Sequence, residues 1–383
     1  MNKVQGLLDQ LVRPEIRLGH HSRSAFQVCG YTGLGLAVVL AMTLVAQRGL
    51  SPWVMGALIL AAMGTFLSLA LATKILSGGE NLVYYHHEIA VILVTTGLLW
   101  LLRQPVLPYL DITILGVGMF LVCGRIGCLM VGCCHGRPHA WGVCYGPAHA
   151  ATGFESYLVG VRLFPVQAVE SLWTLAITLV GAGLVWTGQP AGAALAWYIV
   201  MYDLGRFALE FLRGDAARPY HGVLSEAQWI SLLLMLVVVA AEWRGVLPLH
   251  AWHGIVAGGL ILTMVALVRR QRAGGTVNDQ LLRASHIQEV AEAIVPSPDE
   301  PAIHVRRTSL GIHISVGQIN TGAEAVVHYA LSSAPQGLNA ETAGRLAALI
   351  AQLRHSGQPA ELIQGGQGVY HLLVHSAASL SQG

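Results

Sequence analysis

Apolar stretches alternate with polar breaks over the first 270 residues of the chain. Each stretch has about 20 residues, the length that an α-helix needs to cross the hydrocarbon core of a bilayer. The pattern predicts spanning helices at 26–47, 52–73, 83–102, 109–131, 165–187, 192–211, 226–243 and 249–268. The third is weak because it starts with the polar or amphipathic run 84–88, so we expect seven or eight transmembrane helices in an all-α polytopic membrane protein.

The pattern changes after the last apolar stretch. Residues 269–301 are polar and contain a Gly-Gly pair and a Pro-rich break, which is typical of a linker. Residues 302–377 alternate in the manner of strands, and Ala340 to Arg354 has the spacing of an amphipathic helix. We therefore predict a polar segment 1–25, a transmembrane part 26–268, a linker 269–301 and a small soluble α+β domain 302–383.

The composition agrees with a membrane protein. Charged residues make up 11% of the chain, against about 25% in soluble domains. The net charge of +2 gives no reason to expect a nucleic-acid partner. Residues 1–25 lack the apolar core of a signal peptide, so we expect no cleaved leader.

Four polar clusters interrupt the apolar background. They are Tyr84–Glu88, Cys123–Pro138, Phe164–Glu170 and Tyr202–Arg213. Because successive spans run in opposite directions, the ends that carry these clusters lie on one side of the membrane. We therefore expect the four clusters to form one site.

Arginines are the main chemical feature of that site. A charge such as Arg125 in an apolar segment costs several kcal/mol unless it is paired or hydrated. Tyr202, Arg206, Glu210 and Arg213 are spaced by 4, 4 and 3 residues, which places them on one helix face and pairs Arg206 with Glu210. Guanidinium groups bind phosphate oxygens bidentately, so the pattern favours an anionic phospholipid headgroup.

Plainer interpretations stay open at this stage. The arginines can simply pair with acids and hold helices together, and Gly124 and Gly127 can serve only close helix packing. His86 or His87 can be an interfacial residue rather than a base.

The cysteines are unusual for this setting. Cys128, Cys133 and Cys134 lie near Arg125 in sequence, and a neighbouring cation lowers the pKa of a thiol, so they are candidate reactive thiols. On a continuous helix, steps of five residues from Cys123 place the thiols on different faces. No standard zinc pattern is present, so we assign no metal and no cofactor. A metal or iron–sulfur site stays open for Cys128, Cys133, Cys134, Cys144 and His135.

Residues 26–243 resemble the prolipoprotein diacylglyceryl transferase family. The family signature reads roughly G-R-[IL]-G-N-F-x-N-x-E-x-x-G-R, and its two asparagines and its glutamate are replaced here by Cys128, Val131 and Cys133. The upstream element keeps His86 but loses two glycines. The matching positions are Gly124, Arg125, Ile126, Gly127, Gly132, Gly136, Arg137, Pro165, Gln167, Glu170, Tyr202, Arg206, Glu210, Arg213 and Gln228.

The resemblance implies a bacterial plasma-membrane enzyme that moves a diacylglyceryl group from phosphatidylglycerol to the thiol of a peptide or of another acceptor. It implies catalytic roles for His86, Tyr202, Arg125, Arg206 and Glu210. It implies substrate binding by Gly124, Gly127, Arg137, Gln167, Glu170, Arg213 and Gln228. Two other classes stay open: a non-catalytic lipid-binding sensor, and a thiol redox or metal protein of the membrane.

Basic residues in the flanks of the spans predict the orientation. On the side of the four clusters are Lys3, Arg13, Arg17, Arg23, Lys74, Arg137, Arg162, Arg213, Arg218, Arg269, Arg270 and Arg272, whereas Arg48, Arg103 and Arg244 lie on the other side. The positive-inside rule then places the clusters, both termini and the soluble domain in the cytoplasm. The resembled enzyme works on the outer face, so either function overrides the charge rule or this homologue is inverted.

Overall fold

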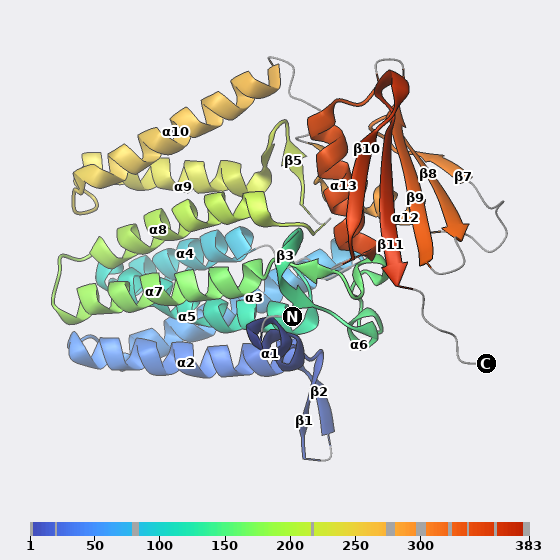
Figure 1. Cartoon of the computed structure of the whole chain (residues 1–383). Helices are drawn as coiled ribbons and strands as arrows, with labels where there is room; N and C mark the ends of the chain where they lie inside the picture. The colour runs from blue at the N-terminus through green and yellow to red at the C-terminus, as the bar shows by residue number, and fades with distance from the viewer. Residues whose placement is uncertain are drawn as a thin grey trace.

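A computed structural model gives the fold, and it describes residues 3–19, 21–78, 84–215, 218–272, 280–295, 304–320, 324–334, 337–355 and 358–377. Long helices occupy all eight predicted positions (Figure 1). They are α2 (Ala25–Gln47), α3 (Pro52–Ser77), α4 (Tyr84–Leu101), α5 (Val106–Val131), α7 (Val166–Trp186), α8 (Ala193–Leu209), α9 (Glu226–Trp243) and α10 (Ala251–Arg272).

Six of these helices are long and apolar enough to cross a membrane: α2, α3, α5, α7, α9 and α10. Helix α4 starts with the polar run 84–88 and has 18 residues. Helix α8 has 17 residues and carries Asp203 and Arg206. The chain is therefore a multi-pass membrane protein with at least these six candidate spans.

Helix α5 is the centre of the bundle. Half of its most apolar window is buried, and α2, α7 and α8 pack along it. Close approach depends on Gly118, where a Cβ atom would overlap the Tyr198 ring and the Thr178 hydroxyl. The buried carboxylate of Asp111 accepts hydrogen bonds from the backbone N–H groups of Gly192 and Leu195, both at 2.7 Å. Since these N–H groups begin α8 and lack partners within the helix, the bonds fix α8 against α5.

A compact cap lies at one end of the bundle, between α5 and α7. It contains β3 (Pro138–Cys144), α6 (Pro147–Ala150), η1 (Ser156–Leu158) and β4 (Arg162–Leu163). The predicted polar segment 1–25 forms α1 (Lys3–Leu11) and the hairpin β1 (Glu15–Leu18) and β2 (His21–Ser24). Asp9 of α1 accepts hydrogen bonds from the Arg162 side chain at 3.0 Å and the Cys144 N–H at 2.8 Å, which attaches the N-terminal helix to the cap.

The C-terminal part is an α+β unit, as its strand pattern predicts. A five-stranded antiparallel sheet has the order β10-β11-β9-β8-β7. Its elements are β7 (His304–Arg307), β8 (Ile312–Asn320), β9 (Glu324–Ser333), α13 (Ala340–Arg354), β10 (Ala360–Gln364) and β11 (Tyr370–Ala377).

The chain between α10 and the sheet differs from the predicted linker 269–301. Helix α10 continues to Arg272, and residues 284–293 form α12 (Ala284–Ala293). Ile287, Val290 and Ile294 are buried at helical spacing in the core of the unit. The polar composition of the segment masked this short apolar stripe. The Gly-Gly pair at 274–275 and the Pro-rich break at 296–301 lie outside the described residues.

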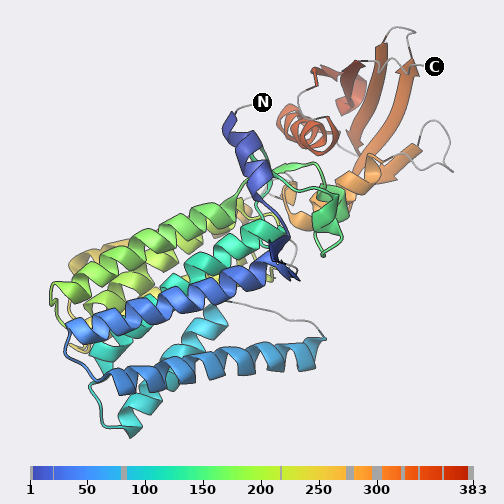
Figure 2. The ribbon, with the colours of Figure 1, turned by 90° about the horizontal axis from the view of Figure 1, so that it is seen from below.

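The C-terminal unit and the cap share one hydrophobic core. Val143, Leu158 and Leu163 of the cap belong to the same buried cluster as Ile287 and Leu349. Helix α13 contacts β3, and α12 contacts η1. Figure 2 shows the unit beyond the end of the bundle that carries the cap.

Candidate functional site

The four polar clusters meet at the capped end of the bundle, as the alternation of spans predicts. Glu170, near the start of α7, is fully buried and connects three of them. Its Oε1 atom lies 3.0 Å from Nη2 of Arg125 on α5 and accepts a 2.9 Å hydrogen bond from the Tyr202 hydroxyl on α8. One carboxylate thus holds the ends of α5, α7 and α8 together.

A second ion network continues from α8 into the loop that follows. The predicted pair of Arg206 and Glu210 is confirmed, with Nη2 and Oε2 2.9 Å apart. Glu210 also binds Arg218 at 2.8 Å. Arg213 leaves the predicted stripe, because the chain tightens into η2 (Glu210–Leu212) and then extends. It forms a 2.7 Å ion pair with Asp215 instead.

Arg137 completes the arginine group. Its Nε donates to the backbone oxygen of Arg213 at 3.1 Å. The site therefore gathers more guanidinium groups than the carboxylates that pair with them. The guanidinium groups belong to Arg125, Arg137, Arg206, Arg213 and Arg218, and the carboxylates to Glu170, Glu210 and Asp215.

Two buried donors of this group have no hydrogen-bond partner among the residues that the structure describes. They are Nε of Arg125 and Nη1 of Arg206. Buried polar groups are nearly always hydrogen-bonded in folded proteins, so such donors call for an acceptor. An oxygen-rich anion supplies acceptors of the right kind, because arginine binds phosphate oxygens through charge-assisted hydrogen bonds.

The signature segment after α5 forms a tight turn and not a continued helix. Helix α5 ends at Val131, and Gly132 adopts the left-handed conformation with φ of 86°. Gly136 then forms a bridge with Arg213, and its N–H donates to the Phe164 oxygen at 3.1 Å. A Cβ atom on Gly136 would collide with that oxygen. The turn thus joins the end of α5 to the start of α7 and the end of α8.

The two glycines that were candidate binding residues differ. Gly127 faces α2, where an added Cβ would lie 3.1 Å from the ring of Phe26 and 3.2 Å from Cβ of Cys29. It therefore serves helix packing. Gly124 has no described atom within 4 Å of its Cβ position, so this side of α5 is open.

Two predicted binding residues mainly hold the scaffold. The Gln167 side chain donates to the Cys133 oxygen at 2.8 Å and so fixes the turn. Gln228 forms a capping box with Ser225 at the start of α9, and its Nε2 donates to the Phe207 oxygen at 3.4 Å.

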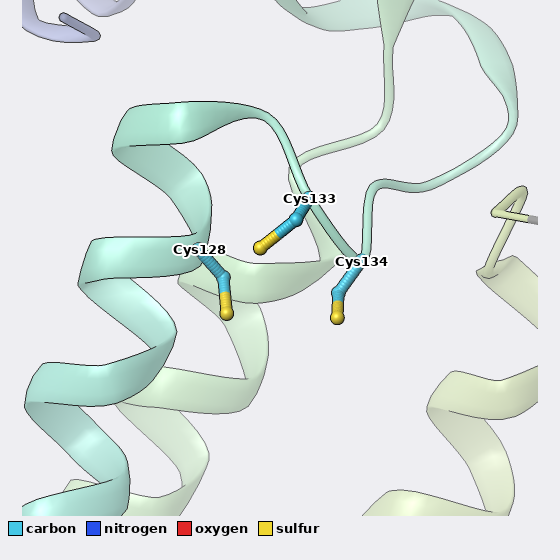
Figure 3. Close-up of side chains that lie close together, drawn as sticks. All are labelled: Cys128, Cys133 and Cys134. Atoms are coloured by element: carbon cyan, nitrogen blue, oxygen red, sulfur yellow. The ribbon is translucent and has the colours of Figure 1, made fainter. Parts of the chain in front are cut away.

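The turn brings three cysteines together. The Sγ atoms of Cys128, Cys133 and Cys134 all lie within 4.8 Å of one another (Figure 3). The expectation that Cys128 and Cys133 lie on different faces is wrong, because it assumed a helix that continues past Val131, whereas Cys123 lies outside this group. Hydrogen bonds with Cys128 and Cys133 hold the pKa of Cys134 well below its usual value, although burial opposes this shift.

The first cluster contributes different residues from those that the sequence suggested. His86 is half exposed, and its Nε2 lies 3.2 Å from Oε1 of Glu226 on α9. Its neighbour Tyr85 instead enters the bundle and donates to Asp203 at 2.8 Å. Tyr85 and Asp203 lie within two of the predicted clusters but were not named as site residues, and Arg218 lies outside the clusters. Asp203, an acid inside an apolar helix next to Tyr202, was the available signal.

A separate group lies at the opposite end of the bundle. Nδ1 of His253 is 2.6 Å from Oε1 of Glu242, and His250 is 3.5 Å from the same oxygen. Sequence reasoning treated these positions only as the ends of two spans. The pairs connect α9 to α10 far from the arginines.

Comparison with known proteins gives consistent matches. A family model described as prolipoprotein diacylglyceryl transferase matches residues 24–244. Phosphatidylglycerol–prolipoprotein diacylglyceryl transferase 2 of Clostridium perfringens is 34% identical over 134 residues, which cover 34% of this chain and 49% of that protein. The Clostridium tetani enzyme of that name is 32% identical over 135 residues, 34% of this chain and 51% of that protein. The chain spans about half the length of the curated relatives it matches.

The turn geometry generates a matched pair of predictions. Gly136→Ala places a Cβ against the backbone oxygen of Phe164, so we expect a loss of about 1–3 kcal/mol of stability. Gly124→Ala meets no described atom and places a better helix former in α5, so this variant should be as stable as the wild type or more stable by up to about 1 kcal/mol. Thermal unfolding of both variants in detergent measures the difference. Equal melting curves for the two variants would contradict this account of the turn.

Proposed function

This chain belongs to the prolipoprotein diacylglyceryl transferase family, and we propose that it transfers the diacylglyceryl group of phosphatidylglycerol to the thiol of an acceptor. The observation that carries the proposal is the pair of buried arginines, Arg125 and Arg206, each with one donor that has no partner among the described residues. The names of the relatives state phosphatidylglycerol and a prolipoprotein as their substrates.

The arginines would hold the phosphate of the lipid headgroup. Glu170 and Glu210 each occupy one terminal nitrogen of their arginine, and so fix the remaining donors in position. The excess of guanidinium groups over their carboxylate partners suits a phosphodiester. Arg137 lies on the turn after α5, and Gly124 lies on the open side of α5. The glycerol part of the lipid would fit beside these two residues.

The reaction requires charge stabilisation and proton transfer. The sulfur of the acceptor attacks the glyceryl carbon, a C–S bond forms, and the C–O bond to phosphate breaks. The glycerol phosphate leaves with negative charge on its oxygen, which Arg125 and Arg206 would stabilise through hydrogen bonds in a water-poor site. The thiol must lose its proton before or during the attack.

His86 is our candidate for the proton acceptor. If the Glu226 carboxylate accepts the Nε2–H of His86, the lone pair of Nδ1 is free to take a proton. Its exposed position outside the arginine network suits contact with an acceptor that arrives from water. Tyr202, with its hydroxyl on Glu170, would orient the carboxylate that holds Arg125.

We further propose eight membrane crossings, including α4 and α8. Helix α1 binds the cap through Asp9, and four helices, α2 to α5, separate them in sequence. The C-terminal unit packs on the same cap, and four helices, α7 to α10, separate the cap from this unit in sequence. Elements on one side of a membrane are separated by an even number of crossings, which supports a crossing by each of these helices.

The basic flanks support an orientation in which the cap, the arginine site and the C-terminal unit face the cytoplasm. Under this proposal the acceptor is presented from the cytoplasmic side. A prolipoprotein that has already crossed the membrane would not reach the site from there.

Arg206→Lys should lower diacylglyceryl transfer at least tenfold, or about 1.4 kcal/mol of transition-state stabilisation. Lysine keeps the charge but loses the planar fork that serves Glu210 and a phosphate at the same time. The assay incubates purified protein with labelled phosphatidylglycerol and a thiol peptide and follows both products by mass spectrometry. Arg244→Lys, at the opposite end of the bundle, is the matched control. Wild-type turnover by Arg206→Lys would remove Arg206 from the site.

His86→Gln should lower the same transfer by about a hundredfold or more, because a general base contributes on that order. Bound phosphatidylglycerol should be measured in the same variant. If the variant still binds the lipid, the loss of activity comes from proton transfer and not from a damaged headgroup site. His250→Gln, at the other end, is the control and should keep full activity. Unchanged turnover by His86→Gln would assign the proton acceptor to another residue.

The orientation predicts two readouts that must agree. A reporter fused after Gly383 that fluoresces only in the cytoplasm should be bright, and Cys144 should resist an impermeant thiol reagent in intact cells. A cysteine introduced at Gln189, in the exposed loop between α7 and α8, should react from outside and serves as the positive control. Labelling of Cys144 from outside would reverse the orientation and restore a secreted prolipoprotein as the acceptor.

A further inference from the structure

We propose that Cys128, Cys133 and Cys134 bind one soft metal ion through three thiolates. The proposal goes beyond lipid transfer, because neither the arginine network nor the reaction uses these sulfur atoms. All three belong to the segment in which cysteines replace polar residues of the family signature at positions 128 and 133. No comparison assigns a metal to this position.

The sulfur geometry suits an ion. A metal such as zinc lies about 2.3 Å from each thiolate, so three ligands around one ion stand about 4 Å apart. The three Sγ atoms already lie within 4.8 Å of one another. To close the triangle, the sulfur atoms must approach one another by at most about 0.8 Å, which small side-chain rotations can supply. Figure 3 shows the sulfur of Cys128 on the last turn of α5 and the other two on the turn that follows.

The backbone of the turn is held in a costly conformation that brings the sulfurs together. Cys134 has a φ of 54°, a left-handed value that is unfavourable for a residue with a Cβ atom. A glycine would adopt it without that cost. Strained residues cluster at functional sites, where the surrounding structure maintains them. Here Gln167 binds the Cys133 oxygen, and the Gly214 N–H donates to the His135 oxygen at 3.0 Å.

Two positive charges lie near the sulfur atoms. A divalent ion with three thiolates carries a net charge of −1, and a monovalent ion leaves −2. The guanidinium groups of Arg125 and Arg213 act on Cys134 from nearby. Arginine is always charged, so these cations stabilise an anionic metal complex at any physiological pH.

The ligand set selects the class of ion. Three sulfur atoms without oxygen ligands favour soft ions such as Cu(I), Zn(II), Cd(II) or Hg(II) over Mg(II) or Mn(II). His135 is engaged elsewhere, with Nδ1 bonded to the Gly136 oxygen at 2.8 Å and Nε2 3.5 Å from Glu155. Cys133 is exposed, which gives the ion a path from water.

The test uses the full-length protein in detergent, reduced, stripped of metal and kept without oxygen. Titration with Cd(II) should give a sulfur-to-metal charge-transfer absorption that saturates at one equivalent and has the intensity of three thiolates. Mg(II) should not compete. A parallel titration with Cu(I) against a chelator of known affinity decides between monovalent and divalent soft ions, and tight binding of either ion supports the site.

The variants separate this site from the other thiols. Cys128→Ser, Cys133→Ser and Cys134→Ser should each weaken Cd(II) binding at least tenfold and lose one third of the absorption. A control with Cys29, Cys123 and Cys144 all changed to serine should bind like the wild type. Helical circular dichroism checks that each variant folds, and X-ray absorption of the loaded wild type counts sulfur neighbours without any mutation. Absent binding by the wild type, loss of binding in the control, or full binding by Cys134→Ser would each overturn the proposal.

Discussion

The structure depends on how the bundle neutralises buried positive charge. Arg125 lies near the end of α5, the most buried of the six candidate spans, and an unpaired guanidinium there would cost several kcal/mol. Glu170 removes that cost by pairing with Arg125 and accepting a hydrogen bond from Tyr202. Because the three residues come from α7, α5 and α8, one electrostatic requirement sets the relative position of three helices. Loss of one partner of such a buried pair costs about 3–5 kcal/mol, since the other charge is left alone.

The same requirement explains the turn after α5. In the arginine group, Arg137 and the loop after α8 lie close to the start of α7. If α5 continued as a helix past Val131, Arg137 would lie far from that loop. Gly132 ends the helix, and Gly136 lets the chain pass the Phe164 carbonyl at backbone contact distance. Both roles need a residue without Cβ, the first for a positive φ and the second for space. The convergence of the three thiols follows from this path of the chain.

Hydropathy was sufficient to locate all eight helices, because spanning length and apolar composition are local properties of the sequence. Alternation of spans was sufficient to predict that the clusters converge. Finer orientation was not predictable in this way. Tyr85 and His86 are adjacent, but successive positions on a helix differ by about 100°, so one enters the bundle and the other faces Glu226. Cys128, Cys133 and Cys134 were named as candidate thiols from the sequence, but their convergence was not predicted, because a face calculated for a straight helix has no meaning beyond Gly132. Helix α12 was missed because three apolar residues in a polar segment become a core only when a sheet covers them.

The thiols and the charged flanks both concern the side of the membrane on which the capped end of the bundle lies. One argument uses redox chemistry and the other uses membrane insertion. Three free cysteines within 4.8 Å, one of them exposed, would tend to form a disulfide in an oxidising compartment, whereas the cytoplasm keeps thiols reduced. The flanking arginines and lysines favour the cytoplasm for the same end of the bundle through their effect on insertion. The first argument rests on Cys128, Cys133 and Cys134 and the second on lysines and arginines, so the two share no residue. Reduced thiols in the turn would therefore agree with the orientation that the flanks favour, and a disulfide among them would contradict it.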